Sequence, residues 1–209
     1  MSAQLPYAHI LRRRPAQARS AERVEALLDA AAELLRDREP DAITVRDLAA
    51  AAGVPTGTLY QFFEDKDAVL QALAVRFLAA MPGVLDASIA SGRDDWSHTV
   101  GQVVDAYAAM VREHPAIRRL WLSGTLDAAT RLVERATDAT IAARLGALLR
   151  TQAGSRRGTP EQWRTLVALI DALLVHAFTE DPDGDPLALR EARRAARAYA
   201  GAVLGLTPA

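Results

Sequence analysis

The sequence predicts an all-α protein. Over long stretches, apolar residues recur three and four positions apart, which is the period of an amphipathic helix. Glycine and proline fall between these stretches. In a β-rich protein they would instead separate short runs in which apolar and polar residues alternate. Half of the 209 residues are hydrophobic, which is enough for a substantial core in one or two small domains.

The first helix is expected from Ser20 to Arg38, and the Glu-Pro-Asp run at 39–41 ends it. Its apolar residues lie at helical spacing, while acidic and basic residues occupy the other faces. The apolar positions are Val24, Leu27, Leu28, Ala31, Leu34 and Leu35.

A capping box marks the start of the next helix. Thr44 is followed three residues later by Asp47, a spacing at which each side chain can bond the backbone N–H of the other residue. We therefore expect a short helix from Val45 that stops at Gly53. A second short helix, TGTLYQFF, follows over residues 56–63.

Two short helices joined through a glycine turn form the helix-turn-helix pattern, in which the second helix enters the DNA major groove and the first braces it. The same spacing also fits an ordinary corner between helices. The remaining helices are expected at about 66–80 (before Met81, Pro82 and Gly83), from Gly92 and Asp94 to Glu113, from Pro115 through Trp121, and at 127–152, 160–179 and 187–206.

The last two helices predict a homodimer. The helix at 160–179 is apolar nearly all round, and the helix at 187–206 sets one apolar stripe against an arginine-rich face. Pairing this hairpin with its own copy would bury the surplus apolar surface in a twofold four-helix arrangement. The arginines of that face are Arg190, Arg193, Arg194 and Arg197.

Composition excludes several classes of function. There is no cysteine, so neither a disulfide framework nor a thiolate zinc site is expected. A net charge of −1 means that DNA binding would depend on a local arrangement of charges. We found no signal-peptide core or membrane span, which favours the cytoplasm, and we expect no cofactor.

The run from Thr44 to Lys66, TVRDLAAAAGVPTGTLYQFFEDK, closely resembles the signature of the TetR family of repressors. The resemblance covers roughly residues 20–75. Its elements are Thr44, Leu48-Ala49, Gly53-Val54, Gly57-Thr58-Leu59-Tyr60, Phe63 and Lys66. It implies a basic arm and DNA-binding domain at 1–66, and an effector-binding and dimerisation domain at 67–209.

The resemblance implies a ligand-responsive regulator, most simply a repressor that binds a palindromic operator as a homodimer and is released by a small-molecule inducer. An activator with the same fold and a helical dimeric protein-interaction module are the alternatives. An enzyme is not expected, because the chain has no HExxH, GxSxG, GxGxxG or phosphate-loop motif and its four histidines are scattered.

Within the run, the roles divide into packing, phosphate contact and base readout. Gly53 would supply the positive φ of the turn, and the packing positions are Leu48, Ala49, Val54, Leu59 and Phe63. Phosphate contacts are expected from Thr44, Tyr60 and Lys66, and base readout from Thr56, Thr58 and Gln61 beside Gly57. For Tyr60, half-buried packing is the alternative.

Arginines precede the first helix. Arg12, Arg13, Arg14 and Arg19 form a basic arm that would contact the minor groove or phosphates, or remain a solvated tail.

The resemblance also implies a ligand cavity in the second domain. Its candidate lining residues, which equally fit plain core packing, are Tyr107, Met110, Trp121, Thr140 and His176. The acidic loop at 181–185 does not match a calcium loop, since its glycine is misplaced and the bidentate acid is missing, so no metal is expected.

Overall fold

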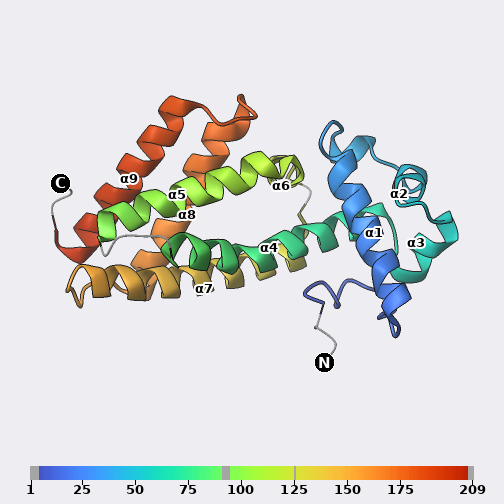
Figure 1. The fold of residues 1–209 in the computed structure, drawn as a ribbon, viewed down its shortest axis with the longest axis horizontal. Coiled ribbons are helices and arrows are strands. Elements are labelled where there is room, and N and C mark those ends of the chain that lie inside the picture. The colour runs from blue at the N-terminus through green and yellow to red at the C-terminus, as the bar shows by residue number, and fades with distance from the viewer. Residues whose placement is uncertain (1–4, 91–94, 125, 207–209) are drawn as a thin grey trace. The chain divides into compact units, whose positions relative to one another are not determined.

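The computed structural model describes residues 5–90, 95–124 and 126–206, and within them every regular element is helical (Figure 1). This confirms the predicted all-α class. The elements are α1 (Ala18–Leu34), a 3-10 turn η1 (Pro40–Ala42), α2 (Val45–Ala51), α3 (Thr56–Phe62), α4 (Lys66–Ala90), α5 (Trp96–Glu113), α6 (Pro115–Leu122), α7 (Ala128–Gln152), α8 (Pro160–Thr179) and α9 (Pro186–Leu204). Gly92 and Asp94, the expected start signals of α5, lie outside the described residues.

The chain forms two compact units, and α4 and α7 pass through both. The first unit combines the chain up to Ala79 with His114–Val133, and the second combines Ala80–Glu113 with the chain from Glu134 onward. These compact units do not test where the DNA-binding part of the chain ends. The boundary expected at residue 66 stays a prediction.

The core of the first unit is built around α1, which packs on α2 and α3 (Figure 1). The expected packing positions Leu48, Ala49, Leu59 and Phe63 are buried, and Val54 is half-buried. Tyr7 and Leu11, which precede α1, belong to the same core. The segment before α1 is therefore folded onto the unit.

Helix α4 continues through Pro82, so the expected end near Ala80 is wrong. Proline removes one backbone hydrogen bond and normally breaks or kinks a helix. Here Leu78 and Leu85, on either side of it, are both buried and stabilise the helical conformation. By length and composition α4 could also cross a membrane, but half of its most apolar window is buried in the protein, as in a core helix.

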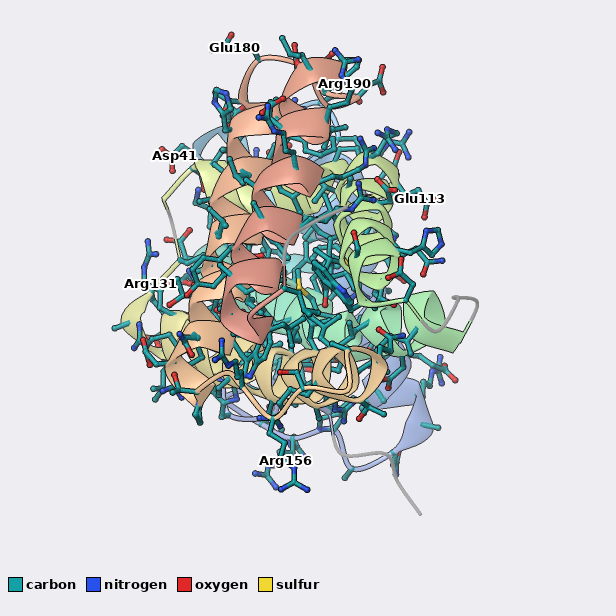
Figure 2. The ribbon with its side chains drawn as sticks, turned by 90° about the vertical axis from the view of Figure 1, so that its left-hand side faces the viewer. Asp41, Glu113, Arg131, Arg156, Glu180 and Arg190 are labelled. Atoms are coloured by element: carbon teal, nitrogen blue, oxygen red, sulfur yellow. The ribbon has the colours of Figure 1, made fainter. Side chains whose placement is uncertain are left out.

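In the second unit, α8 and α9 form an antiparallel hairpin, and α9 also packs on α5. Figure 2 shows Glu180 and Arg190 at one end of this hairpin and Arg156 at the other. The expected arginine face of α9 is divided. Arg193 Nε donates to Asp105 Oδ1 at 2.6 Å and Arg197 Nε donates to the Ser97 carbonyl at 3.0 Å, so both bind α5 and its start.

The Arg197 guanidinium crosses α5 at Gly101, where a Cβ atom would overlap it. A larger residue at position 101 would therefore push the end of this flexible side chain away from its present place on α5. In contrast, Arg190 and Arg194 are exposed, so the solvated arginine face is smaller than the sequence indicates.

Gly53→Ala is expected to destabilise the protein by about 1 kcal/mol, because Gly53 has a φ of 65° that non-glycine residues disfavour. Nothing lies within 4 Å of an added Cβ, so the cost is purely conformational. Thermal unfolding should show a Tm lower by about 2–4 °C.

Gly57→Ala is the matched control, since Gly57 also has open space around it but lies inside α3 without a positive φ. Its Tm should stay equal or rise. Equal losses in both variants would contradict the conformational explanation.

Candidate functional site

The start of α2 is held by the capping box that the sequence predicts. Thr44 Oγ1 accepts from the Asp47 N–H at 3.2 Å, and Asp47 Oδ2 accepts from the Thr44 N–H at 2.9 Å. Arg38 adds a bond to Asp47 Oδ2 at 3.0 Å. Hydrogen bonds from Thr44, and then from Arg38, lower the pKa of Asp47 to about 2. The start of α2 is thus fixed by a carboxylate that stays ionised at neutral pH.

The same pair engages the Thr44 hydroxyl. Its proton is donated to Asp47 Oδ2 at 2.7 Å, and a hydroxyl has only one proton to donate. Thr44 is exposed, but it acts as a cap here. Its expected phosphate contact stays a prediction that requires this bond to be exchanged.

One face of α3 is polar and solvent-exposed, consisting of Thr56, Gly57, Tyr60 and Gln61. Tyr60 is 46% exposed, which disfavours the alternative that it only packs. In the described part of the chain, the side chains of Thr56, Tyr60 and Gln61 form no hydrogen bond within the protein. Their donors and acceptors are available to a partner.

Thr58 differs from its expected position. It is only 9% exposed. Phe62 lies four positions later in the same helix, so both side chains lie on the buried face of α3. Thr58 therefore does not present its methyl group beside Thr56 and Gln61.

Lys66 begins α4 and binds back to η1. Its Nζ donates to the Pro40 carbonyl at 2.9 Å, and its side chain is 25% exposed. Because Pro40 lies shortly before α2, this bond helps to fix where α2 starts. The ammonium has three N–H donors, so this bond leaves others available, and the expected phosphate contact of Lys66 stays a prediction beside its structural role.

The basic arm is attached to the end of α3. The Arg12 N–H donates to the Phe62 carbonyl at 2.9 Å, and its guanidinium lies 3.5 Å from the Tyr60 carbonyl. Arg13, Arg14 and Arg19 are exposed. The arm therefore lies beside the polar face of α3.

Tyr7 anchors the arm from its other end. It is 1% exposed, and its hydroxyl donates to Glu25 on α1. Burial and this hydrogen bond raise the pKa of Tyr7. Arg76 on α4 neutralises the site by pairing with Glu25 at 2.9 Å and Asp29 at 2.7 Å. The arm is thus held at both ends before any partner binds.

The structure does not gather the expected effector residues into one buried set. Tyr107 and Met110 on α5 are buried, whereas Thr140 and His176 are exposed and the Thr140 hydroxyl donates to Ala136 in its own helix. Trp121 belongs to the first unit. Tyr107 donates to the Met81 carbonyl over 3.4 Å.

Sequence reasoning missed two carboxyls near Tyr107. Desolvation, and then the neighbouring Asp138 and Glu134, raise the pKa of Asp171 to about 7 although its side chain keeps solvent access. Desolvation and Glu134 raise that of Asp138 to about 6. Their charges also act on the Tyr107 hydroxyl. The available signal was Asp171 itself, a single acid in the apolar run 165–179.

Two family models match this chain. The model described as bacterial regulatory proteins, tetR family, matches residues 27–73, which include α2 and α3. The model described as tetracyclin repressor-like, C-terminal domain, matches residues 94–201. Together they cover most of the chain.

Solved structures and curated proteins agree with these matches. A TetR-family transcriptional regulator from Streptomyces coelicolor is 34% identical, with a TM-score of 0.68 over 88% of this chain and 99% of that chain. A TetR transcription regulator from Haloarcula marismortui shares the fold at 20% identity, with a TM-score of 0.70 over the same shares of the two chains. The HTH-type transcriptional repressor KstR2 of Rhodococcus jostii is 36% identical over 91 residues, 44% of this chain and only 45% of the repressor.

Asp171→Asn is expected to stabilise the protein above pH 7. The pKa of Asp171 rises from 3.8 unfolded to about 7 folded, so the folded protein keeps a proton that the unfolded chain releases, and stability falls as pH rises between these values. The gain should be on the order of 1 kcal/mol, because solvent partly screens the charge.

Urea unfolding at pH 5 and pH 8 measures this effect. The variant should exceed the wild-type protein in stability at pH 8 more than at pH 5. Glu180→Gln, at the exposed end of α8 (Figure 2), should change neither value. A pH-independent difference for Asp171→Asn would overturn the assignment.

Proposed function

This chain belongs to the TetR family of bacterial regulatory proteins, and from that premise we propose that it is a repressor that binds a palindromic operator as a homodimer and leaves it when a small-molecule inducer binds. The observation that carries the proposal is the polar face of α3. It is exposed, its side chains are free, and capped α2 supports it from behind.

We propose that α3 enters the major groove. Gln61 can pair two-pronged with adenine, and the methyl group of Thr56 can contact thymine. Tyr60 would donate to a phosphate and set the register. Gly57 has open space where a side chain would lie, so the helix backbone can approach the DNA closely there.

Thr44 and Lys66 would act mainly by positioning α2, through the bonds to Asp47 and Pro40. Thr58 supports α3 from the buried side. Base readout is accordingly assigned to Thr56 and Gln61 alone.

The dimer would form through α8 and α9. Each helix exposes several small or aliphatic side chains, which permit close approach of a second copy. These residues are Ala168, Ala172, Val175 and Thr179 on α8, and Leu187, Ala198 and Ala202 on α9. Asp171 on α8 and the ion pair of Arg194 with Glu191 on α9 are exposed among them. Twofold pairing would present two α3 helices to the two halves of a palindrome.

The effector would bind in the second unit, with Tyr107 and Met110 as the best-supported contacts because both are buried on α5. An inducer that prefers the non-binding form would lower operator affinity by its differential binding to the two forms. A bacterial regulator that binds operator DNA would act in the cytoplasm. It needs no cofactor and no catalytic residue.

A gel-shift titration against the DNA flanking the gene, at two salt concentrations and with random duplex as competitor, tests the function. Tight, competitor-resistant binding to a palindrome is the expected result. Binding no better than to random duplex would favour the alternative, a helical protein-interaction module. Measuring transcription from the adjacent promoter with and without the protein then distinguishes the two kinds of regulator: a repressor lowers it and an activator raises it.

Gln61→Ala should change which bases are preferred, whereas Tyr60→Phe should lower the affinity for all duplexes by the same factor. Loss of one hydrogen bond predicts a roughly 3- to 10-fold weaker affinity for Tyr60→Phe. Competition by operators with single base changes distinguishes the two effects. Identical base preferences in Gln61→Ala and the wild-type protein would contradict the assignment of readout to Gln61.

Ala198→Asp should prevent dimerisation, because it buries an unpaired charge in the proposed interface. Light scattering after gel filtration should give the monomer mass. Ala136→Asp, on the exposed side of α7, makes the same chemical change and should remain a dimer. A dimeric Ala198→Asp would place the interface elsewhere.

A further inference from the structure

A hollow of about 200 Å³ lies where the basic arm, the start of α1 and the end of α3 meet. Its lining combines residues that are far apart in sequence. They are Arg13, Arg14, Pro15, Ala16, Gln17, Ser20, Arg23, Gln61 and Phe62. Gln61, the proposed reader of bases, thus forms one wall of it.

Three arginines line this hollow, and no carboxylate pairs with them in the described part of the chain. Arg13, Arg14 and Arg23 are exposed and take part in no ion pair or hydrogen bond with another described residue, and no acidic side chain lines the hollow. Elsewhere in the same unit, Arg38 and Arg76 are paired with carboxylates. The hollow therefore concentrates positive charge without a counterion from the protein.

The hollow keeps its shape because the arm is attached on both sides. The Arg12 N–H is bound to the Phe62 carbonyl at 2.9 Å, immediately before Arg13. Tyr7 is buried further upstream. Arg23 is fixed by α1, one residue before the buried Val24. The three cations are thus brought together by folding and do not depend on DNA to be arranged.

We propose that this hollow binds a backbone phosphate of the operator, beside the base that Gln61 contacts, with Arg13 and Arg14 from the arm and Arg23 from α1 as its ligands. Guanidinium groups donate hydrogen bonds in a fork that fits phosphate oxygens. The inference rests on the proposed function. It adds Arg23 to the interface and assigns the arm to the phosphate backbone.

The geometry favours a phosphate over the minor groove. A minor-groove arm must extend away from the protein to insert between the strands, whereas Arg12 is bonded to α3 and leaves Arg13 beside it. A concave site formed by the arm, α1 and α3 suits a single compact anion.

The test is the salt dependence of binding, measured by fluorescence anisotropy on the operator and on a random duplex of equal length. Arg23→Ala and the double variant Arg13→Ala/Arg14→Ala should lower the affinity for both duplexes by similar factors, roughly 3- to 10-fold per arginine. Because the three arginines share one phosphate, loss of that contact should reduce the slope of log K against log salt by about 0.9 in total. Arg190→Ala, an equally exposed arginine on α9, should change neither quantity.

A methylphosphonate scan locates the phosphate. Methylphosphonates remove the charge of one phosphate at a time. At the phosphate beside the base that Gln61 contacts, this change should weaken binding by the wild-type protein. The same change should weaken binding by Arg23→Ala little further. Additive losses at every position would overturn the shared site.

The outcomes separate this inference from the proposed function. Tight operator binding with an unchanged slope in all arginine variants would overturn the phosphate site and leave the repressor intact. A loss in Arg13→Ala/Arg14→Ala that depends on A·T content beside the operator would assign the arm to the minor groove instead. If no operator is preferred, the repressor proposal fails, and the slope on random duplex still decides whether the hollow binds phosphate.

Discussion

The burial of one side of α3 is the interaction on which the exposed polar face of this helix depends. A helix of seven residues is far too short to be stable alone in water. Leu59, Phe62 and Phe63 hold it against the core that α1 and α2 share. Because their burial fixes the rotation of α3 about its axis, it also decides which residues face outward. Packing on one side of α3 therefore decides which side chains it offers to a partner.

Polar bonds at the ends of short elements complete this arrangement. Asp47 fixes the start of α2, Lys66 connects α4 to η1, and Arg12 connects the arm to the end of α3. Thr44 and Lys66, expected from the sequence to contact phosphates, also bond groups inside the protein, namely Asp47 and the Pro40 carbonyl, and their DNA contacts stay predictions. On α3, the side chains of Tyr60 and Gln61 bond no other group in the described part of the chain, and both are exposed.

Sequence reasoning succeeded where structure is determined locally. The cap at Thr44, the turn glycine at 53 and the Pro160 start of α8 each act within a few residues, and those boundaries agree with the structure. It failed where distant packing decides. The passage of α4 through Pro82, the burial of Thr58 and the bonds of Arg193 to α5 all depend on partners that local patterns do not reveal. The DNA and effector contacts stay predictions.

The crossing of Arg197 over Gly101 couples the two positions in one direction only. The guanidinium occupies the space of a side chain at position 101 and bonds the Ser97 carbonyl. A methyl group at position 101 would push the end of this flexible side chain aside and weaken that bond, whereas a shorter residue at position 197 leaves the glycine without any clash. The bond between α9 and the first turn of α5 therefore tolerates loss of the arginine without strain, but the glycine can be lost only if the arginine finds another place.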